Sequence, residues 1–318
     1  MWAYRLAGPG RFERCTVAEP DAPSAGQVVL RTTSGGICGS DLNFFRGGTT
    51  PEGTSKDSMF GVPGFPLHEI TGQVVASAHP EHAVGDRVVG WAARTDGVAE
   101  FVTTSGDEVA AYRAGLKPEI AVLIQPLACV LHAVGAMGDV RGKNVALLGL
   151  GPIGLLFAHV LRDRGAGRIT GVDRVNRAVL GARFGVDEVV WASADRWARD
   201  AVLEPELVVE CIGHQAGTLN DAIRAVASNG QIYYFGVADE SSQSVDLRRL
   251  QRKNLTLRSG ITLDRRRALA EADTYLAGHP ELESGYVTDV FHAVEIESAY
   301  RRALNPTAEQ GKVVVRMP

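Results

Sequence analysis

The sequence predicts an α/β protein of two domains, a β-rich first half followed by a doubly wound parallel sheet. In the first half, short apolar runs are separated by Gly, Pro and Asp, which is typical of short strands joined by turns. In the middle, strand-like and helix-like runs alternate, as in parallel strands with helical crossovers. A chain of 318 residues is long enough for two such domains.

The first half contains four expected strands and one long loop. The strands are Gln27–Thr32, Gly72–Ala76, Arg87–Trp91 and Ala99–Thr103. The segment Gly47–Pro63 is rich in Gly, Thr, Ser and Pro, so we expect a loop there. Loops of this length in compact domains are often functional.

The middle of the chain contains six expected strands, and the tail returns to the first domain. The six are Val145–Leu148, Ile169–Val172, Glu188–Trp191, Leu207–Cys211, Gln231–Phe235 and Leu255–Arg258, with helical patterns such as Ala216–Ala227 between most of them. The tail carries helical patterns at Asp264–Leu276 and Ile296–Leu304, a strand near Val287–His292, and an edge or closing strand at Lys312–Arg316. We therefore expect one domain from residues 1–123 and 263–318 and a second from residues 124–262.

The most informative motif is Gly149–Leu150–Gly151–Pro152–Ile153–Gly154, which follows a strand-like run and precedes a helix-like run, Leu155–Arg164. A G-x-G-x-x-G pattern in this context is typical of a dinucleotide-binding turn. The first glycine allows a tight turn, the second lets the backbone approach the pyrophosphate, and the third lets helix and strand pack closely. The helix N-terminus then supplies free N–H groups to the phosphates.

Two charged residues at the end of the next expected strand predict the choice of cofactor. Asp173 lies 24 residues after Gly149, near the spacing of the acidic residue that binds the adenosine ribose. Its carboxylate would repel a 2′-phosphate and favours NAD, whereas an arginine such as Arg174 can favour NADP. We expect NAD. The predicted cofactor-binding residues are Gly149, Gly151, Pro152, Ile153, Gly154, Asp173 and Arg174.

Composition argues against several classes of partner. The formal net charge is −4 and no dense Lys/Arg run occurs, so we expect neither nucleic acid nor an anionic membrane as partner. The charged stretch Met1–Cys15 is no signal peptide, and the apolar stretch Val145–Ala158 is broken by three glycines and a proline, so we expect no membrane span. Four scattered cysteines without a C-x-x-C pair predict no disulfide framework and a cytoplasmic location.

Cys38 and the adjacent pair His68 and Glu69 are the candidate metal ligands. Zinc binds thiolate, imidazole and carboxylate groups, and a catalytic site uses three of them plus an open position. A thiolate and a carboxylate around a neutral imidazole would offset the charge of Zn²⁺. Spacing alone leaves an alternative open, in which Cys38 is a buried cysteine and His68–Glu69 a surface or capping pair.

Several segments, in the right order, resemble the medium-chain, zinc-dependent dehydrogenases, the superfamily of alcohol, sorbitol, threonine and glucose dehydrogenases. They are Gly36–Leu42 (the zinc-ligand segment), Pro66–Val74 (the Gly-His-Glu segment, with Leu67 in place of glycine), Val84–Val88, Asp96–Val102 and the nucleotide loop. The resemblance covers essentially the whole chain. It implies a GroES-like β domain plus a Rossmann domain, with a C-terminal return to the first domain.

The resemblance also implies a ligand set for one catalytic zinc. Cys38 and His68 would bind it, with Glu69 as a direct or intermittent ligand. A further family ligand, Cys or Glu, precedes a Pro-Leu pair, and here that position is Gln125, whose neutral amide is a weaker ligand than a carboxylate. Gln125 either joins the zinc or leaves it to Glu69 or a water. Cys129 is expected to be a buried helix residue.

The chain departs from many relatives at two places. The segment Gly90–Gly97 contains no cysteine where relatives carry four for a structural zinc, so we expect one catalytic zinc and no structural zinc. Relatives often have a histidine, five residues after the cysteine ligand, that passes the substrate proton to solvent. That position is Asn43, and an amide cannot act as a base near neutral pH, so the proton needs another route such as water.

The activity that the resemblance implies is hydride transfer between NAD(H) and a secondary alcohol or ketone. Zinc would lower the pKa of the alcohol, the Ser40 hydroxyl would take its proton, and the nicotinamide would accept the hydride. The predicted catalytic residues are Ser40, Cys38, His68 and Glu69. The alternatives are a zinc-free enone or quinone reductase of the same superfamily and a catalytically lapsed nucleotide-binding protein.

The predicted substrate is a polyol, sugar or cyclitol. The Cys-Gly-Ser-Asp form and the adjacent His68–Glu69 resemble the polyol and sugar branch of the family. The loop Arg46–Met59 supplies polar side chains that could pair with hydroxyl groups, namely Arg46, Thr49, Thr50, Glu52, Thr54, Ser55, Lys56 and Asp57. The alternative is that this loop is solvated surface. Members of the family are commonly dimers or tetramers, so we expect a homodimer or homotetramer.

Overall fold

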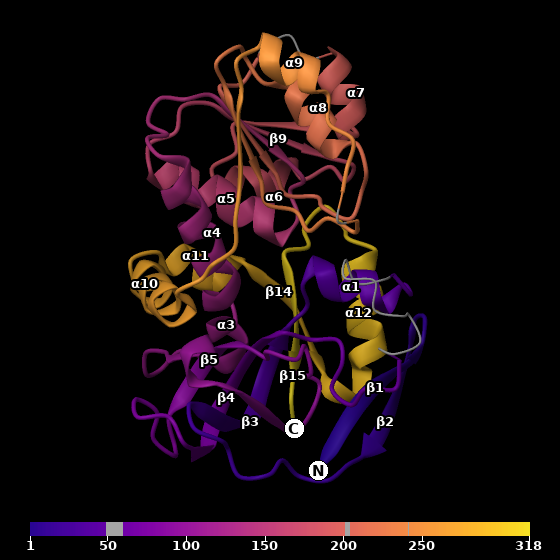
Figure 1. Ribbon diagram of the computed structural model, residues 1–318, viewed down its shortest axis with the longest axis vertical. Coiled ribbons are helices and arrows are strands. Elements are labelled where there is room, and N and C mark those ends of the chain that lie inside the picture. Colours follow the sequence, from indigo (N-terminus) through magenta and orange to yellow (C-terminus); the bar gives the residue numbers. More distant parts are fainter. Residues whose placement is uncertain (49–59, 201–203, 241) are drawn as a thin grey trace. The chain divides into compact units, whose positions relative to one another are not determined.

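The computed structural model describes residues 1–48, 60–200, 204–240 and 242–318. The chain divides into two compact units (Figure 1). The first unit comprises Met1–Cys129, Thr262–Pro306 and Lys312–Pro318, and the second comprises Val130–Ile261 and Thr307–Gly311. The domain limits expected from the sequence stay a prediction. Most of the expected loop Gly47–Pro63 lies outside the described residues.

The first unit is built on a mainly antiparallel sheet, which has seven strands within the described residues. Their order is β14 (Val287–His292), β15 (Lys312–Arg316), β3 (Gln27–Gly36), β4 (Glu69–Ser77), β5 (Arg87–Trp91) and β7 (Val109–Ala111), with β6 (Phe101–Ser105) paired to β3. A separate pair consists of β1 (Trp2–Gly8) and β2 (Arg11–Thr16). The helices are α1 (Gly39–Phe45), α3 (Pro118–Ala121), α10 (Arg265–Ala277), α11 (Pro280–Gly285) and α12 (Ile296–Leu304), and α4 (Ile124–Met137) continues into the second unit.

The closing strand predicted at Lys312–Arg316 is confirmed, but it is not an edge. β15 lies between β14, to which it is parallel, and β3, to which it is antiparallel. Gly36 at the end of β3 is paired with Val314 on one side and Glu69 on the other. This pairing on both sides explains why β3 extends beyond the predicted Gln27–Thr32 to Gly36.

An aromatic cluster fixes α1, the helix that follows β3. Tyr300 of α12 is fully buried, and its ring centroid lies 5.0 Å from that of Phe12 and 5.1 Å from that of Phe45. Phe45 is the last residue of α1, so this packing holds α1 against α12. No sequence pattern predicted α1, because only seven residues form it and tertiary packing rather than periodicity stabilises so short a helix.

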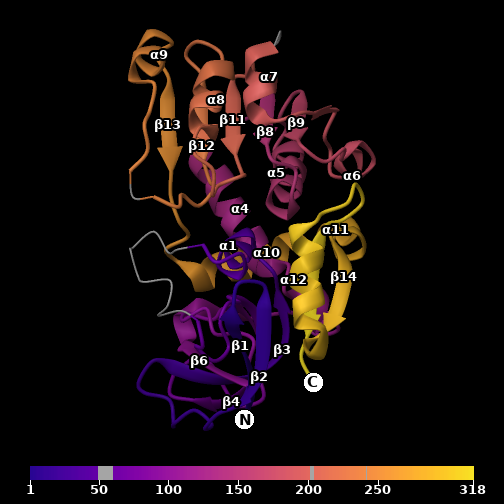
Figure 2. The ribbon, with the colours of Figure 1, turned by 90° about the vertical axis from the view of Figure 1, so that its right-hand side faces the viewer.

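The second unit contains a parallel sheet, with six strands within the described residues (Figure 2). Their order is β10 (Glu188–Trp191), β9 (Ile169–Asp173), β8 (Val145–Leu148), β11 (Leu207–Glu210), β12 (Gln231–Tyr234) and β13 (Thr256–Ser259). The crossover helices are α5 (Pro152–Asp163), α6 (Ala178–Arg183), α7 (Ala194–Asp200), α8 (Thr218–Ala225) and α9 (Leu247–Arg252). This order confirms the doubly wound Rossmann sheet, and its switch point between β8 and β11 is where such sheets bind ligands.

One helical segment, Pro118–Met137, is long and apolar enough to cross a membrane by length and composition alone. It is a core segment, because 67% of its most apolar window is buried inside the protein. The apolar stretch Val145–Ala158 forms β8, the glycine turn and the start of α5, as predicted.

Candidate active site

The register of two strands brings the candidate metal ligands together. Gly36 of β3 is paired with Glu69 of β4. Cys38 follows Gly36 by two residues and His68 immediately precedes Glu69, so both side chains arise at the same end of this strand pair. The ligand atoms of Cys38, His68 and Glu69 all lie within 4.8 Å of one another. One zinc ion with bonds of about 2.0–2.3 Å can bridge such a set.

Asp41 orients both Cys38 and His68. Its fully buried carboxylate accepts a hydrogen bond from the Cys38 backbone N at 2.9 Å, and its other oxygen lies 2.9 Å from His68 Nδ1. Nδ1 is thereby engaged, which leaves Nε2 as the ligand atom. Burial lowers the pKa of His68, but the charge and hydrogen bond of Asp41 and the nearby Cys38 outweigh it and hold that pKa well above its usual value. A carboxylate behind a histidine is the usual support of a metal-binding imidazole.

The sequence contained a signal for Asp41 that went unused. Cys38 is the N-cap of α1, and Asp41 is three residues further on, the spacing of a capping box. A carboxylate at that position accepts a hydrogen bond from the backbone at the helix start, which fixes the turn that carries Cys38.

Lys312 is a second residue that the sequence analysis missed. Its ammonium group is paired with the Glu69 carboxylate, and both side chains are buried. Gly36 makes room for this pair, because a Cβ at Gly36 would lie 2.4 Å from Glu69 Oε2 and 2.9 Å from Lys312 Cε. No local pattern could reveal the pair, since 243 residues separate its members.

Gln125 and Cys129 lie one turn apart on α4. Gln125 is 2% exposed, and its Nε2 lies 4.0 Å from Cys129 Sγ. Burial raises the pKa of the Cys129 thiol to about 11; a hydrogen bond with Thr262 opposes the rise and the charge of Glu69 adds to it. Cys129 is therefore a neutral thiol near the ligand cluster. It lies on a helix, as predicted, but it is half-buried rather than fully buried. Coordination of a metal by Gln125 stays a prediction.

Ser40 and Asn43 are both on α1, close after Cys38. Ser40 is in the first turn and Asn43 in the next, and both are half-buried. Residues three apart on a helix are neighbours on one face. Arg46 is the C-cap of α1 and is exposed. The remaining polar loop residues lie outside the described part of the chain, namely Thr49, Thr50, Glu52, Thr54, Ser55, Lys56 and Asp57.

The glycine turn of the second unit has the geometry predicted for it. Gly149 has φ +92°, which favours glycine, and a Cβ at Gly154 would lie 2.0 Å from the Gly149 carbonyl oxygen. Gly151 is the N-cap of α5, and a Cβ there would meet nothing within 4 Å, so its surroundings are open. The helix begins at Pro152 rather than Leu155, because proline is pre-organised for the first helical position.

Asp173, at the end of β9, braces this turn. Its carboxylate accepts hydrogen bonds from Leu150 N at 2.8 Å and Val175 N at 2.7 Å. Arg174 is exposed, and its carbonyl accepts a hydrogen bond from Trp191 Nε1 at 2.9 Å. A cavity of about 360 Å³ lies at this edge of the sheet. Its lining includes Gly149, Gly151, Asp173, Arg174 and, from the loop after β11, Cys211, Ile212, Gln215 and Ala216.

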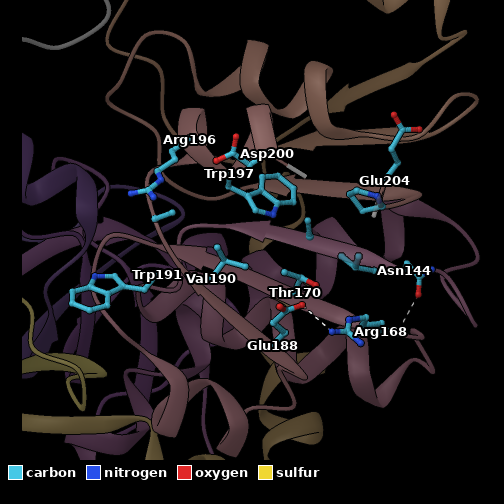
Figure 3. A pocket seen from close by; sticks show the side chains of 14 residues that line it. Asn144, Arg168, Thr170, Glu188, Val190, Trp191, Arg196, Trp197, Asp200 and Glu204 are labelled. Atoms are coloured by element: carbon cyan, nitrogen blue, oxygen red, sulfur yellow. Dashed lines mark hydrogen bonds and ion pairs between the residues drawn. The ribbon is translucent and has the colours of Figure 1, made fainter. Parts of the chain in front are cut away.

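A second cavity of the same unit, about 460 Å³, lies beside α7 (Figure 3). Trp191 and Trp197 line it, together with the ion pair of Arg168 and Glu188, whose N and O atoms are 2.8 Å apart. None of the predicted site residues lines this cavity, although it is the larger of the two. Volume therefore does not distinguish the two cavities by function; the glycine turn and Asp173 line the smaller one.

The family models that match cover both units. A model of the alcohol dehydrogenase GroES-like domain matches residues 24–137, and a model of the zinc-binding dehydrogenase matches residues 152–277. The chain is 30% identical to a sorbitol dehydrogenase from Gallus gallus over 271 residues, 74% of each chain. It is 28% identical to a D-altritol 5-dehydrogenase from Agrobacterium fabrum over 311 residues, 86% of this chain and 88% of that one.

A solved structure supports the fold independently. An alcohol dehydrogenase from Thermus sp. ATN1 superposes with a TM-score of 0.79, covering 100% of both chains at 23% identity. At that identity the likeness establishes the fold alone.

Proposed function

Because this chain belongs to the medium-chain, zinc-containing alcohol dehydrogenase superfamily, we propose that it transfers a hydride between NAD(H) and a secondary alcohol or ketone. The chain is a zinc-type, NAD(P)-dependent dehydrogenase. One observation carries the finer proposal: the ligand atoms of Cys38, His68 and Glu69 lie within 4.8 Å of one another. These three side chains would hold one zinc ion, with Gln125 beside it, and no second zinc.

The residues of the first unit suit the proposed chemistry. Bound zinc supplies Lewis-acid chemistry, polarising an alcohol oxygen and lowering its pKa. Asp41 holds His68 with Nε2 free to bind, and Lys312 holds the Glu69 carboxylate in place. Ser40, two residues after Cys38, would take the hydroxyl proton of the alcohol. With Asn43 where relatives have a histidine, water would carry that proton onward.

The second unit would bind the cofactor in the cavity that Gly149, Gly151 and Asp173 line. The glycine turn leaves its N–H groups for the pyrophosphate. The Asp173 carboxylate has lone pairs beyond the two backbone hydrogen bonds that it accepts, so it could also bind the adenosine ribose hydroxyls. We therefore propose NAD over NADP, even though Arg174 is adjacent.

The proposed substrate is a polyol, sugar or cyclitol. Two of the relatives are named for the oxidation of sugar alcohols, a sorbitol dehydrogenase and a D-altritol 5-dehydrogenase. The polar loop that would contact such hydroxyl groups lies largely outside the described residues. The proposed substrate class is therefore supported by the relatives and by the Cys38–Asp41 motif. A cytoplasmic location remains part of the proposal.

We also propose a homodimer or homotetramer. The edge strand β13 is exposed along its length, with Leu257 41% exposed and, just after it, Ile261 69% exposed. An unpaired strand edge with apolar side chains is a template for pairing with a second chain. Light scattering coupled to gel filtration measures the assembly, and a monomer at working concentration would contradict this proposal.

The function is tested by metal analysis together with a substrate panel. We expect one zinc per chain and reduction of NAD by sorbitol-like, inositol-like and hexose substrates with a higher kcat/KM than by ethanol, butanol or benzyl alcohol. Zinc-free protein that reduces enones would favour the zinc-free reductase, and protein that binds NADH but turns over nothing would favour a lapsed nucleotide-binding protein. A higher kcat/KM for the apolar alcohols would contradict the proposed polyol, sugar or cyclitol substrate.

A further inference from the structure

In the second unit, a histidine and an aspartate join the loops at the carboxyl ends of β11 and β12. His214 lies in the loop after β11, and its Nδ1 is hydrogen-bonded to Asp239 Oδ1 in the loop after β12. The backbones of the same two loops are also joined, because His214 N donates to the Val237 carbonyl at 2.7 Å. Neither His214 nor Asp239 belongs to the site predicted from the sequence.

The backbone at His214 is in an uncommon conformation. Its φ is +49°, in the left-handed region where few residues other than glycine occur, although histidine is among those that tolerate it. Residues persist there when the surrounding contacts determine their position, and such residues cluster at ligand-binding sites. At His214 those contacts are the hydrogen bonds to Asp239 and Val237.

The same two loops are packed tightly at their base. A Cβ on Gly213 would lie 2.6 Å from Val237 N, and a Cβ on Gly236 would lie 2.3 Å from Gly213 N. The buried Glu210 side chain accepts hydrogen bonds from Ile212 N and Gly213 N at 3.0 Å each, and its carbonyl accepts one from Gly236 N at 3.0 Å. The loops are thus held at the base by Glu210 and at the rim by the His214–Asp239 pair.

One of these loops forms a wall of the cavity of about 360 Å³ that the glycine turn lines. Ile212 and Gln215, on either side of His214 in the sequence, line the cavity, as do Cys211 and Ala216. Within the described residues, nothing from the loop after β12 lines it. This wall is attached to the second loop through the hydrogen bonds of His214 to Asp239 and to the Val237 carbonyl.

We propose that His214 and Asp239 form a clasp that pre-organises the Ile212–Gln215 wall for the cofactor. The inference rests on the proposed function to the extent that the ligand of this cavity is a nicotinamide dinucleotide. A wall that is already ordered before binding spares the ligand the cost of ordering it, so the clasp raises affinity without touching the reacting atoms. His214 and Asp239 are positioning residues.

Three variants separate the hydrogen bond from the backbone conformation. His214→Gly removes the imidazole while leaving a positive φ accessible. Asp239→Asn removes the charge at nearly constant shape. His214→Asn tolerates the left-handed conformation and retains an N–H donor for Asp239, so it is the conservative rescue.

The same unit offers a matched control away from the cavity. Asn229 has φ +61° and Asn254 has φ +52°, and Asn254 Nδ2 donates to Asn229 Oδ1 at 2.8 Å. This pair also links two loop residues in the left-handed conformation. Its loops precede β12 and β13, however, so they lie at the amino ends of these strands, whereas His214 and Asp239 lie beyond the carboxyl ends of β11 and β12. Asn229→Gly therefore breaks the same kind of link without altering the cavity wall.

The experiment is a fluorescence titration of the full-length, zinc-loaded chain with NADH, without any alcohol. We expect His214→Gly and Asp239→Asn each to raise the Kd for NADH about fivefold or more, and His214→Asn to stay within about twofold of wild type. The double variant, His214→Gly with Asp239→Asn, should bind NADH no more weakly than the weaker-binding single variant, because both substitutions act on the same interaction. Hydrogen exchange at the Ile212–Gln215 amides should quicken in the clasp variants, while zinc content and the unfolding midpoint follow the Asn229→Gly control.

The outcomes distinguish the clasp from the proposed function. Wild-type protein that fails to bind NADH would overturn both. Wild-type protein that binds NADH, with His214→Gly and Asp239→Asn binding equally well, would overturn the clasp alone. An equal loss of affinity in Asn229→Gly would also overturn it, because the effect would then be a general loosening of the unit.

Discussion

Lys312 Nζ lies 2.7 Å from Oε1 and 2.6 Å from Oε2 of Glu69, and the two side chains are only 2% and 1% exposed. The ligand atoms of Cys38 and His68 lie within 4.8 Å of a Glu69 carboxylate oxygen, so this carboxylate has both a cation and the other candidate ligands as neighbours. A buried carboxylate that loses its partner is strongly destabilising, at about 3–5 kcal/mol. A metal ion bound beside it would offset part of that loss.

Lys312→Met should therefore lower the unfolding midpoint of the metal-free protein and enlarge the stabilisation that zinc provides. Thermal unfolding with and without zinc measures both effects. Lys117→Met, at an exposed lysine of the same unit, is the control. Equal zinc-induced shifts in wild type and Lys312→Met would show that Lys312 does not influence the metal site.

Asp41→Asn should weaken zinc binding by about 10–100-fold, the usual effect of removing a carboxylate behind a metal-binding histidine. The substitution keeps the shape but removes the charge beside His68, and it replaces one of the two acceptor oxygens that serve His68 Nδ1 and Cys38 N with an amide donor. Competition with a chromogenic chelator measures the affinity. Asp107→Asn, at an exposed aspartate 3.4 Å from His79 in the same unit, is the matched control and should bind zinc normally.

Asp173→Ala should narrow the preference for NAD over NADP, which we expect to be at least about tenfold in wild type, or about 1.4 kcal/mol. The variant should also lose NAD affinity, because the carboxylate braces the glycine turn through Leu150 N. Kinetics with both cofactors measure the ratio. Arg174→Ala, at the exposed neighbouring position, should leave the preference for NAD in place. If the wild-type protein prefers NADP, Arg174 rather than Asp173 determines the choice of cofactor.

Glu210→Gln should raise the free energy of unfolding at neutral pH and change it little in acid. Burial raises the pKa of Glu210, and hydrogen bonds from Gly213 N and Ile212 N only partly oppose the rise. A carboxyl group whose pKa is higher in the folded than in the unfolded protein does not lower the free energy of unfolding at a pH where it is protonated in both states. Once the pH rises through the folded pKa, this group lowers the free energy of unfolding by about 1.4 kcal/mol for each unit of difference between the two pKa values.

Urea unfolding of wild type and Glu210→Gln across this window measures the prediction. The free energy of unfolding of the variant, minus that of wild type, should grow as the pH rises from below the unfolded pKa to neutrality. Glu206→Gln, at an exposed residue immediately before the same strand, is the control. A difference that stays constant with pH would refute the assigned role of burial at Glu210.

Much of the fold could be predicted because its signals are local. The strands Val145–Leu148 and Glu188–Trp191 were predicted with their observed bounds, since short runs rich in β-branched, aromatic or other apolar residues between turn residues mark strands; the first is fully buried and the second is a partly exposed edge strand. The glycine turn was readable because Gly149 needs a positive φ and Gly154 has no room for a Cβ, and both requirements arise within six residues. The strands β1 and β2 were missed, because they form a separate two-stranded sheet and mix charged with apolar side chains without a clear alternation.

The residue types that could bind a metal and a dinucleotide are readable from the sequence, because Cys38, His68, Glu69 and the glycine motif are short patterns with chemistry of their own. The groups that surround them come together only through tertiary contacts. Lys312 reaches Glu69 through the register of β15, β3 and β4, and Asp41 stands behind His68 because α1 starts where β3 ends. Strand register and burial arise from contacts between distant segments, and no window of sequence encodes such contacts.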